Sequence, residues 1–325
     1  MRRIKKILQS QTGIALITVI LIISILVAAA LELNRSSRAD VYDAANLSDG
    51  LKLTYMAKSG FYGAVALLVN STTPYDTLRD DWAQAEILSA QSKALFTNGY
   101  FIVRIEDETG KIPLYKLLTG DPVNPVNPVM KEILVRLLQQ PEFALDERRV
   151  DEIVDAIIDW MDADERVSTW GAESSYYASL ERPYAAKNAP LDCIEELLMI
   201  RGITNELFAG KKDKPGLGQF VTIYGTGVIN INTAPKMVLR ALSPDITAEV
   251  ADRMDEYRRN KNNNLSAANW YTKVPGIGSV TIKAEMTVKS DYFKIFSTGV
   301  ADRMEQSVVG VIQRAPFRIM NWRQD

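Results

Sequence analysis

The sequence predicts an α+β fold in which a long N-terminal helix packs on a small antiparallel sheet and a large all-α domain is inserted in the sheet region. An apolar N-terminal run continues into an amphipathic pattern, and no proline occurs before Pro74. Alternating strand patterns appear at 100–106 and return only at 292–312. Helical patterns fill most of the chain between them, so the strands complete one sheet only if that block is an insertion.

The first element is a membrane-spanning segment. Four basic residues lie within the first six, and the 18 residues from Ile14 to Leu31 carry no charge. A run of this length is just sufficient to cross a bilayer as one helix. Because Lys and Arg are retained on the cytoplasmic side, the basic head is expected inside and the rest of the chain across the membrane.

A proteolytic site is expected before the apolar run. Glu32 to Arg35 do not form the small-residue site that follows a secretory signal, whereas Gly13 separates the basic head from the run. This arrangement resembles the leader of type IV pilins and type II secretion pseudopilins. The resemblance implies that a prepilin peptidase cuts after Gly13 and methylates the new N-terminus at Ile14. The alternative is a plain signal anchor in which Gly13 is incidental.

One position departs from that pattern. Pilins and pseudopilins usually have Glu at the fifth mature residue, which here is Thr18. Among pseudopilins, absence of this Glu is typical of the minor subunit of the K type. A subunit without the carboxylate is expected to join its filament differently.

The helical pattern continues beyond the membrane, and one helix is expected from about Ile14 to about Val69, with its second half packed on a sheet. The stripe assigned to this packing follows spacings of three and four: Ala44, Leu47, Leu51, Tyr55, Tyr62, Val65 and Val69. A short helix is expected near 83–95 and a strand at 100–106. A turn at 107–110 would lead to a short partner strand at 111–114.

The remaining chain divides at a proline-rich linker, Gly120 to Pro128. Helices are expected at 129–138, 146–161, 191–200, 234–242 and 246–259, and strands at 292–297 and 307–312. The expected organisation is a leader (1–13), a transmembrane part (14–31), a pilin-like α/β part (32–118), an inserted helical domain (119–287) and C-terminal strands completing the sheet (288–325).

Composition excludes several classes of function. The 325 residues include no His and one Cys, Cys193, so a His-dependent triad, a usual zinc site and an internal disulfide are excluded. Without the four basic leader residues the chain has 34 basic and 40 acidic residues, a net charge of −6. This charge does not favour nucleic acid. No phosphate-binding glycine loop is present, and we expect no enzymatic activity.

An acidic run at 159–165, followed by Glu173, is the strongest candidate site. Asp155, Asp159 and Asp162 would lie on one helix face, where like charges repel unless they are solvated or neutralised. Oxygen ligands without His or Cys suit Ca²⁺. The residues alone leave two interpretations, a solvated acidic helix end or a calcium site.

A resemblance of the surrounding region to a known family supports the calcium interpretation. The region 154–204 is similar to the K-type minor pseudopilins in Asp159-Trp160-Met161-Asp162-Ala163-Asp164, Gly171-Ala172-Glu173, Tyr176-Tyr177, Pro183-Tyr184, Lys187 to Leu191, and Glu196 to Gly202. Pseudopilins of this type bind calcium in an acidic loop. The resemblance therefore implies a structural calcium site on Asp162, Asp164 and Glu173, with Asp159 as a weaker member.

A helix start followed by a hairpin motif forms a second candidate, and Ile200 to Ile203 is a weaker second hairpin. Asn232 or Thr233 is placed to cap a helix near Pro235, and Val274 to Gly278 reads Pro-Gly-x-Gly at its core, which resembles helix-hairpin-helix DNA-binding modules. Acidic neighbours offset Lys273 and Lys283. A structural hairpin without nucleic acid is the favoured interpretation, and a membrane-anchored DNA-binding protein is the alternative.

Taken over the whole chain, the resemblance implies a minor pseudopilin at the tip of a type II secretion pseudopilus. Such a protein stays in the inner membrane with its globular part in the periplasm. It assembles with the minor subunits I and J and the major pseudopilin, starts the filament and supports protein export. A minor tip pilin of a type IV pilus is a further alternative, which the sequence alone separates poorly from this one.

Overall fold

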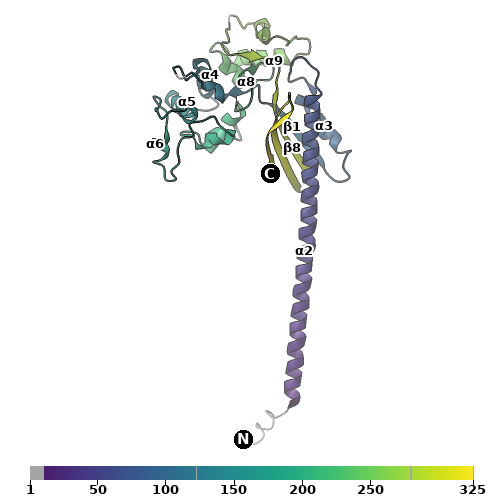
Figure 1. Cartoon of the computed structure of the whole chain (residues 1–325). Coiled ribbons are helices and arrows are strands. Elements are labelled where there is room, and N and C mark those ends of the chain that lie inside the picture. The colour runs from purple at the N-terminus through teal and green to yellow at the C-terminus, as the bar shows by residue number, and fades with distance from the viewer. Residues whose placement is uncertain (1–10, 122, 279, 325) are drawn as a thin grey trace.

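The computed structural model describes residues 11–121, 123–278 and 280–324; most of the expected leader therefore lies outside the described residues. A single helix, α2 (Gln11–Val69), forms a stalk that leads into a head of sheet and helices (Figure 1). The helix ends where the sequence predicts, ahead of Pro74. Its apolar part is fully exposed, as expected for a segment that meets lipid rather than protein.

The main sheet has the strand order β1-β8-β9-β10 and is antiparallel throughout. Its strands are β1 (Tyr100–Asp107), β8 (Tyr292–Ala301), β9 (Met304–Gln313) and β10 (Arg318–Gln324). Tyr100 pairs with Val300 and Asp107 with Phe293, so strands from either side of the long insert are direct neighbours. The predicted fold class is confirmed. β10 has no counterpart among the expected strands.

The face of α2 that packs on this sheet differs from the expected stripe. The buried apolar residues are Leu53, Met56, Ala57, Phe61, Ala64, Val65 and Leu68. Tyr55 and Tyr62 are instead more than half exposed. Both faces of this helix carry apolar residues, so periodicity alone could not show which one meets the sheet. The assignment of the sheet-facing stripe was wrong except at Val65.

Short elements follow the long helix and close one side of the sheet. They are a 3₁₀ turn at Asp81–Gln84 and helix α3 (Glu86–Ser92), which lies along β1. The prediction that a strand at 111–114 pairs with β1 was wrong. Strand β2 (Ile112–Pro113) pairs in parallel with β5 (Val221–Thr222) of the insert, because the turn after β1 directs the chain away from the sheet.

The insert is mainly helical. Its helices are α4 (Pro128–Leu138), α5 (Glu147–Met161), α6 (Ser174–Tyr177), α7 (Asn205–Ala209), α8 (Lys236–Leu242) and α9 (Ala248–Arg259), with 3₁₀ turns at Leu114–Leu117, Ile194–Met199, Leu217–Gln219 and Ala268–Lys273. It also contains two-residue strands, β3 (Gly210–Lys211), β4 (Lys214–Pro215), β6 (Ile229–Asn230) and β7 (Met286–Thr287). Pairings of two residues are too short to leave an alternating pattern in the sequence.

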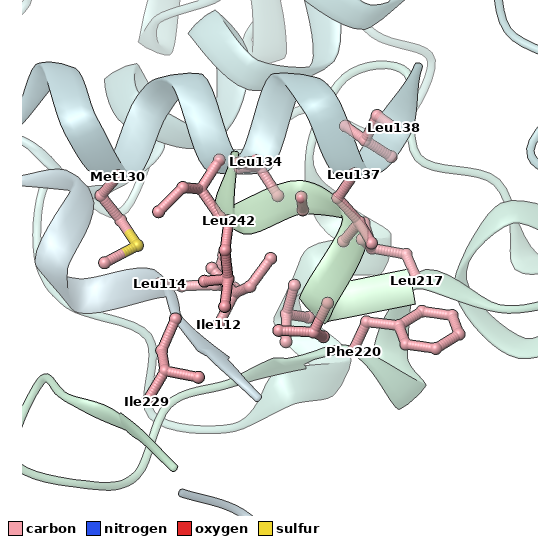
Figure 2. Packing of buried hydrophobic residues seen from close by; sticks show 14 of the residues in the cluster. Ile112, Leu114, Met130, Leu134, Leu137, Leu138, Leu217, Phe220, Ile229 and Leu242 are labelled. Atoms are coloured by element: carbon pink, nitrogen blue, oxygen red, sulfur yellow. The ribbon is translucent and has the colours of Figure 1, made fainter. Parts of the chain in front are cut away.

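Two hydrophobic cores hold the head together. One lies between α2, α3 and the sheet and includes Phe61, Phe101 and Phe293. The other lies inside the insert, where leucines of α4 pack against α8 and the turn around Leu217 (Figure 2). Ile112 and Leu114 belong to the second core although they follow β1 closely, so the chain enters the insert already buried in it.

Candidate metal centre and family

Three carboxylates of the acidic region meet at one end of α5. One oxygen each of Asp159, Asp162 and Glu173 lies within 4.8 Å of the others. Asp159 stands on the last turn of α5, Asp162 caps that helix, and Glu173 precedes α6. The fold thus brings a loop residue onto a helix end that already carries two acids.

The surroundings make this arrangement costly without a cation. α5 has no basic residue in its last turn, and its C-terminus carries the negative end of the helix dipole. Glu173 is 1% exposed, and neither of its carboxylate oxygens has a hydrogen-bond partner among the described residues. A buried carboxylate without a partner carries an uncompensated desolvation cost. Hard oxygen donors with an unsatisfied member fit the requirements of Ca²⁺.

The protonation behaviour of the three carboxylates has a common cause. Burial, followed by the charges of Asp159 and Asp162, raises the pKa of Glu173 to about 7. Burial likewise raises the pKa of Asp162 to about 6 and raises that of Asp159. Each acid therefore resists ionisation because it lies among the others away from water.

The remaining predicted ligand lies apart from this group. Asp164 is exposed, and its carboxylate accepts a hydrogen bond from the Arg166 amide at 2.7 Å. Asp155 also turns away, since it pairs with Lys131 Nζ at 2.7 Å. The structure thus gives Asp159, the weaker member by sequence, a central position and leaves Asp164 at the periphery. The identity of the ligands stays a prediction.

Further residues shape the site. The Ser168 amide donates to Asp159 Oδ2 at 3.0 Å. A side chain at Gly171 would place its Cβ 1.9 Å from the same oxygen, so only glycine fits there. The Asn188 backbone amide donates to the Trp160 carbonyl at 3.0 Å, which holds the irregular segment against the end of α5. Gly171 and Asn188 stand in the motifs quoted above, but sequence gave neither of them a role.

The hairpin motifs have structural partners. Asn232 does not cap α8; its side chain accepts from Trp270 Nε1 at 2.7 Å and donates to the Leu265 carbonyl. Thr233 donates to Asp107 instead. Among the described residues, no helix follows the 274–278 hairpin before β7, and Arg253 contacts the Gly276 carbonyl. These contacts favour a structural role for the hairpin.

The fold defines a class. A long apolar helix becomes amphipathic and packs on an antiparallel sheet, which is the architecture of a pilin-like subunit. The described residues contain one helix long and apolar enough to cross a membrane.

Comparisons with known proteins relate this chain to one family. The family model "Type II secretion system (T2SS), protein K" matches residues 110–212. The type II secretion system protein K of Pseudomonas aeruginosa is 26% identical over 317 residues, covering 94% of this chain and 90% of that protein. The Aeromonas hydrophila protein K is 27% identical over 210 residues, 61% of each chain. The chain is thus similar over nearly its whole length to protein K of type II secretion systems, and this similarity supports a minor pseudopilin.

A solved structure agrees with this fold. A chain in the crystal structure of the GspK-GspI-GspJ complex from enterotoxigenic Escherichia coli superposes with a TM-score of 0.67 at 18% identity. The match covers 87% of this chain and 99% of that chain. The fold of most of this chain is therefore a known arrangement rather than one particular to this sequence.

Proposed function

We propose that this minor pseudopilin caps the tip of a pseudopilus and helps to start its assembly, in support of protein export across the outer membrane. The observation that carries the proposal is the position of the insert. The chain between Asp107 and Tyr292 leaves and rejoins the sheet at the end of the head farthest from the apolar part of α2, and it extends sideways (Figure 1). Such a widened head suits the end of a filament, because shaft subunits must stack closely.

The proposed location follows from the helix. Residues 14–31 anchor the protein in the inner membrane and place the head in the periplasm. A prepilin peptidase would release the chain after Gly13 and leave Ile14 as the methylated terminus. Thr18 Oγ1 donates to the Ile14 carbonyl within its own helix, at 2.9 Å. This position therefore does not offer the carboxylate that could pair with a neighbouring subunit's terminus, which suits the first subunit of a filament.

The proposed partners are the other minor pseudopilins, of the I and J types, and through them the major pseudopilin. The solved GspK-GspI-GspJ complex supports this, since it holds these three subunits together. The role is structural rather than enzymatic.

The proposed cofactor is one structural Ca²⁺ held by Asp159, Asp162 and Glu173. When bound, the ion would neutralise charge that the protein itself leaves unpaired there. It would fix the segment from Arg166 to Pro190 on the end of α5.

Gold labelling of an affinity tag placed in the exposed loop at Lys212, viewed on isolated pseudopili, tests the position. Label at one filament end is expected, whereas label along the shaft would contradict the proposal. N-terminal sequencing of the membrane-extracted protein tests processing: a methylated Ile14 is expected, and an intact Met1 would identify a plain signal anchor.

A further inference from the structure

The outer edge of β1 is covered along only part of its length. Ser92 Oγ accepts from the Phe101 amide at 3.1 Å. Ser89 Oγ accepts from the Val103 amide at 2.8 Å. In an antiparallel pair, residues whose backbone groups point outward alternate with residues that bond to the neighbouring strand. Ile105 is the next outward residue, and no side chain or loop among the described residues bonds to its amide or carbonyl. The edge of β1 is therefore open at Ile105.

A cleft of about 600 Å³ lies at this part of the edge. Residues 104–107 of β1 line it, so the open backbone position belongs to the cleft. The segment after α2 contributes Leu78 and Ala83 to the lining, and the insert contributes Phe220 and Pro235. A free strand edge can accept an extended segment, which adds to the sheet by backbone hydrogen bonds.

Two cations meet over one aromatic ring of this cleft. Lys294 Nζ lies 5.2 Å from the centroid of the Phe296 ring, and the guanidinium carbon of Arg104 lies 4.0 Å from it. All three residues line the cleft. Because Phe293 and Ile295 of β8 pack in the core against α2, Lys294 and Phe296 project from the opposite face of the sheet. Both positive charges therefore lie beside the cleft on that face.

The acids around Lys294 are already paired with other cations. The pairs are Lys111 with Glu108 at 2.6 Å, Lys111 and Arg104 with Glu106, and Arg323 with Glu195 at 3.5 Å. Asp107, which also lines the cleft, accepts hydrogen bonds from Thr233 and Ser290. Lys294 forms no ion pair with any described residue, and burial lowers its pKa. An anion that reaches Lys294 would therefore stabilise its charged form.

An added segment could bring such an anion within reach. Neighbouring strands lie about 4.8 Å apart, so a segment paired with β1 would run ~10 Å from the backbone of β8. Side chains of Glu and Lys that extend toward each other on one face can span this distance. Apolar surface from Leu78, Ala83 and Phe220 would contact the flanking side chains of the segment.

We propose that the cleft binds an extended, acidic segment of another protein, whose backbone pairs with Ile105 and whose carboxylate meets Lys294 and Arg104. The open backbone selects a polypeptide, because only a polypeptide offers an amide and a carbonyl together at strand spacing. The cation without a counter-ion selects Asp or Glu within that polypeptide. The proposed function does not rest on this cleft.

Peptide binding to the full chain in lipid nanodiscs tests the selection of an acid. The probe is labelled acetyl-Thr-Val-Glu-Val-Thr-amide, and the control peptide has Gln in place of Glu. Fluorescence anisotropy should show at least tenfold tighter binding of the Glu peptide. Lys294→Met should reduce this preference to less than threefold. Lys273→Met, at an exposed site of the insert, is the matched control and should keep the full preference.

Hydrogen exchange tests the backbone pairing. With saturating Glu peptide, the Ile105 amide should exchange at least tenfold more slowly, whereas the Val103 amide, already bonded to Ser89, should not change. Equal affinity for the two peptides, or binding without protection of Ile105, would refute the proposal. Acetate that displaces the probe as well as unlabelled Glu peptide does would assign the site to a free carboxylate instead. Protection of Ile105 that rises with protein concentration in the absence of peptide would identify a second copy as the occupant, which also contradicts the proposal.

Discussion

Arg314 and Asp76, 238 residues apart in the sequence, form a bidentate ion pair. Nη1 and Nη2 of Arg314 each lie 2.8 Å from a carboxylate oxygen of Asp76. Asp76 is fully buried, and Arg314 is 7% exposed. Asp76 also accepts from the Ser290 amide at 2.7 Å. The pair therefore joins the segment after α2, the exit of the insert and the end of β9 at one point.

Breaking this pair should destabilise the head. Arg314→Met removes the bidentate cation from the buried Asp76 carboxylate and leaves only Lys289 Nζ, 3.6 Å away, a change that costs about 3–5 kcal/mol. Urea unfolding of the full chain in detergent, followed by tryptophan fluorescence, measures it. Lys52→Met is the control, since the Lys52–Asp49 pair is exposed and should contribute no more than about 1 kcal/mol. Equal losses in both variants would show that the buried pair has no special role.

Asp107 should make stability depend on pH. Burial raises its pKa to about 6, although hydrogen bonds from Ser290, Thr233 and the Thr109 amide oppose this. Because the folded pKa exceeds the ordinary value of 3.8, the native state binds the proton more tightly. The contribution of Asp107 to the free energy of unfolding is therefore complete below about pH 4 and is lost as the pH rises through about 6.

The Asp107→Asn variant isolates this effect. The difference in unfolding free energy between wild type and variant should move in favour of wild type as the pH falls from 6 to 4. The slope should be at most about 1.4 kcal/mol per pH unit. Denaturant curves at half-unit intervals measure it. A difference that does not change with pH would mean that Asp107 titrates normally.

Calcium should stabilise the insert through Glu173. Free ion at a hundredfold excess over its dissociation constant adds about 2.7 kcal/mol. Glu173→Gln should abolish the rise in melting temperature on adding calcium, yet should melt no lower than wild type in EGTA, because the variant loses a repulsive charge. Glu181→Gln, at an exposed site of the same segment, should respond like wild type.

The ligand set implied by family resemblance includes Asp164, whereas the three carboxylates that meet in the structure do not. Comparing Asp164 with Asp162, which belongs to both sets, tests which set binds calcium. Calorimetric titration of Asp162→Asn should show a larger loss of calcium affinity than that of Asp164→Asn, because only Asp162 lies within the group of three carboxylates. A greater loss for Asp164→Asn would place that residue among the ligands and favour the set implied by family resemblance.

Gly60 should not tolerate a side chain. A Cβ at Gly60 would lie 2.3 Å from Ser297 Oγ and 2.8 Å from Phe101, where α2 packs directly on the sheet. Gly60→Ala should destabilise the head by about 1–3 kcal/mol. Gly50→Ala is the matched control on the same helix, with no atom within 4 Å, and should be stabilising by about 0.5–1 kcal/mol. Similar melting temperatures for both variants would contradict this packing.

The general features of this fold could be predicted from the sequence because each depends on residues that are close together along the chain. An uncharged run of 18 residues has to find an apolar environment, and widely separated alternating segments require an insertion to form one sheet. The acidic run was visible for the same reason, since its members are close along the chain. Gly13 and Ile14 likewise stand out by position alone, and their processing stays a prediction.

What the sequence could not decide involves contacts between distant residues. It offered two apolar faces on α2, and only packing against Phe101 and Phe293 selected the one centred on Phe61. It gave no reason to pair β2 with β5, or Asp76 with Arg314, because such pairs form only after the chain has folded back. The sequence by itself determined the anchor, the class of fold and the acidic cluster. The tertiary structure alone decided which carboxylates meet and where the edge of β1 stays open, since both depend on segments that only folding brings together.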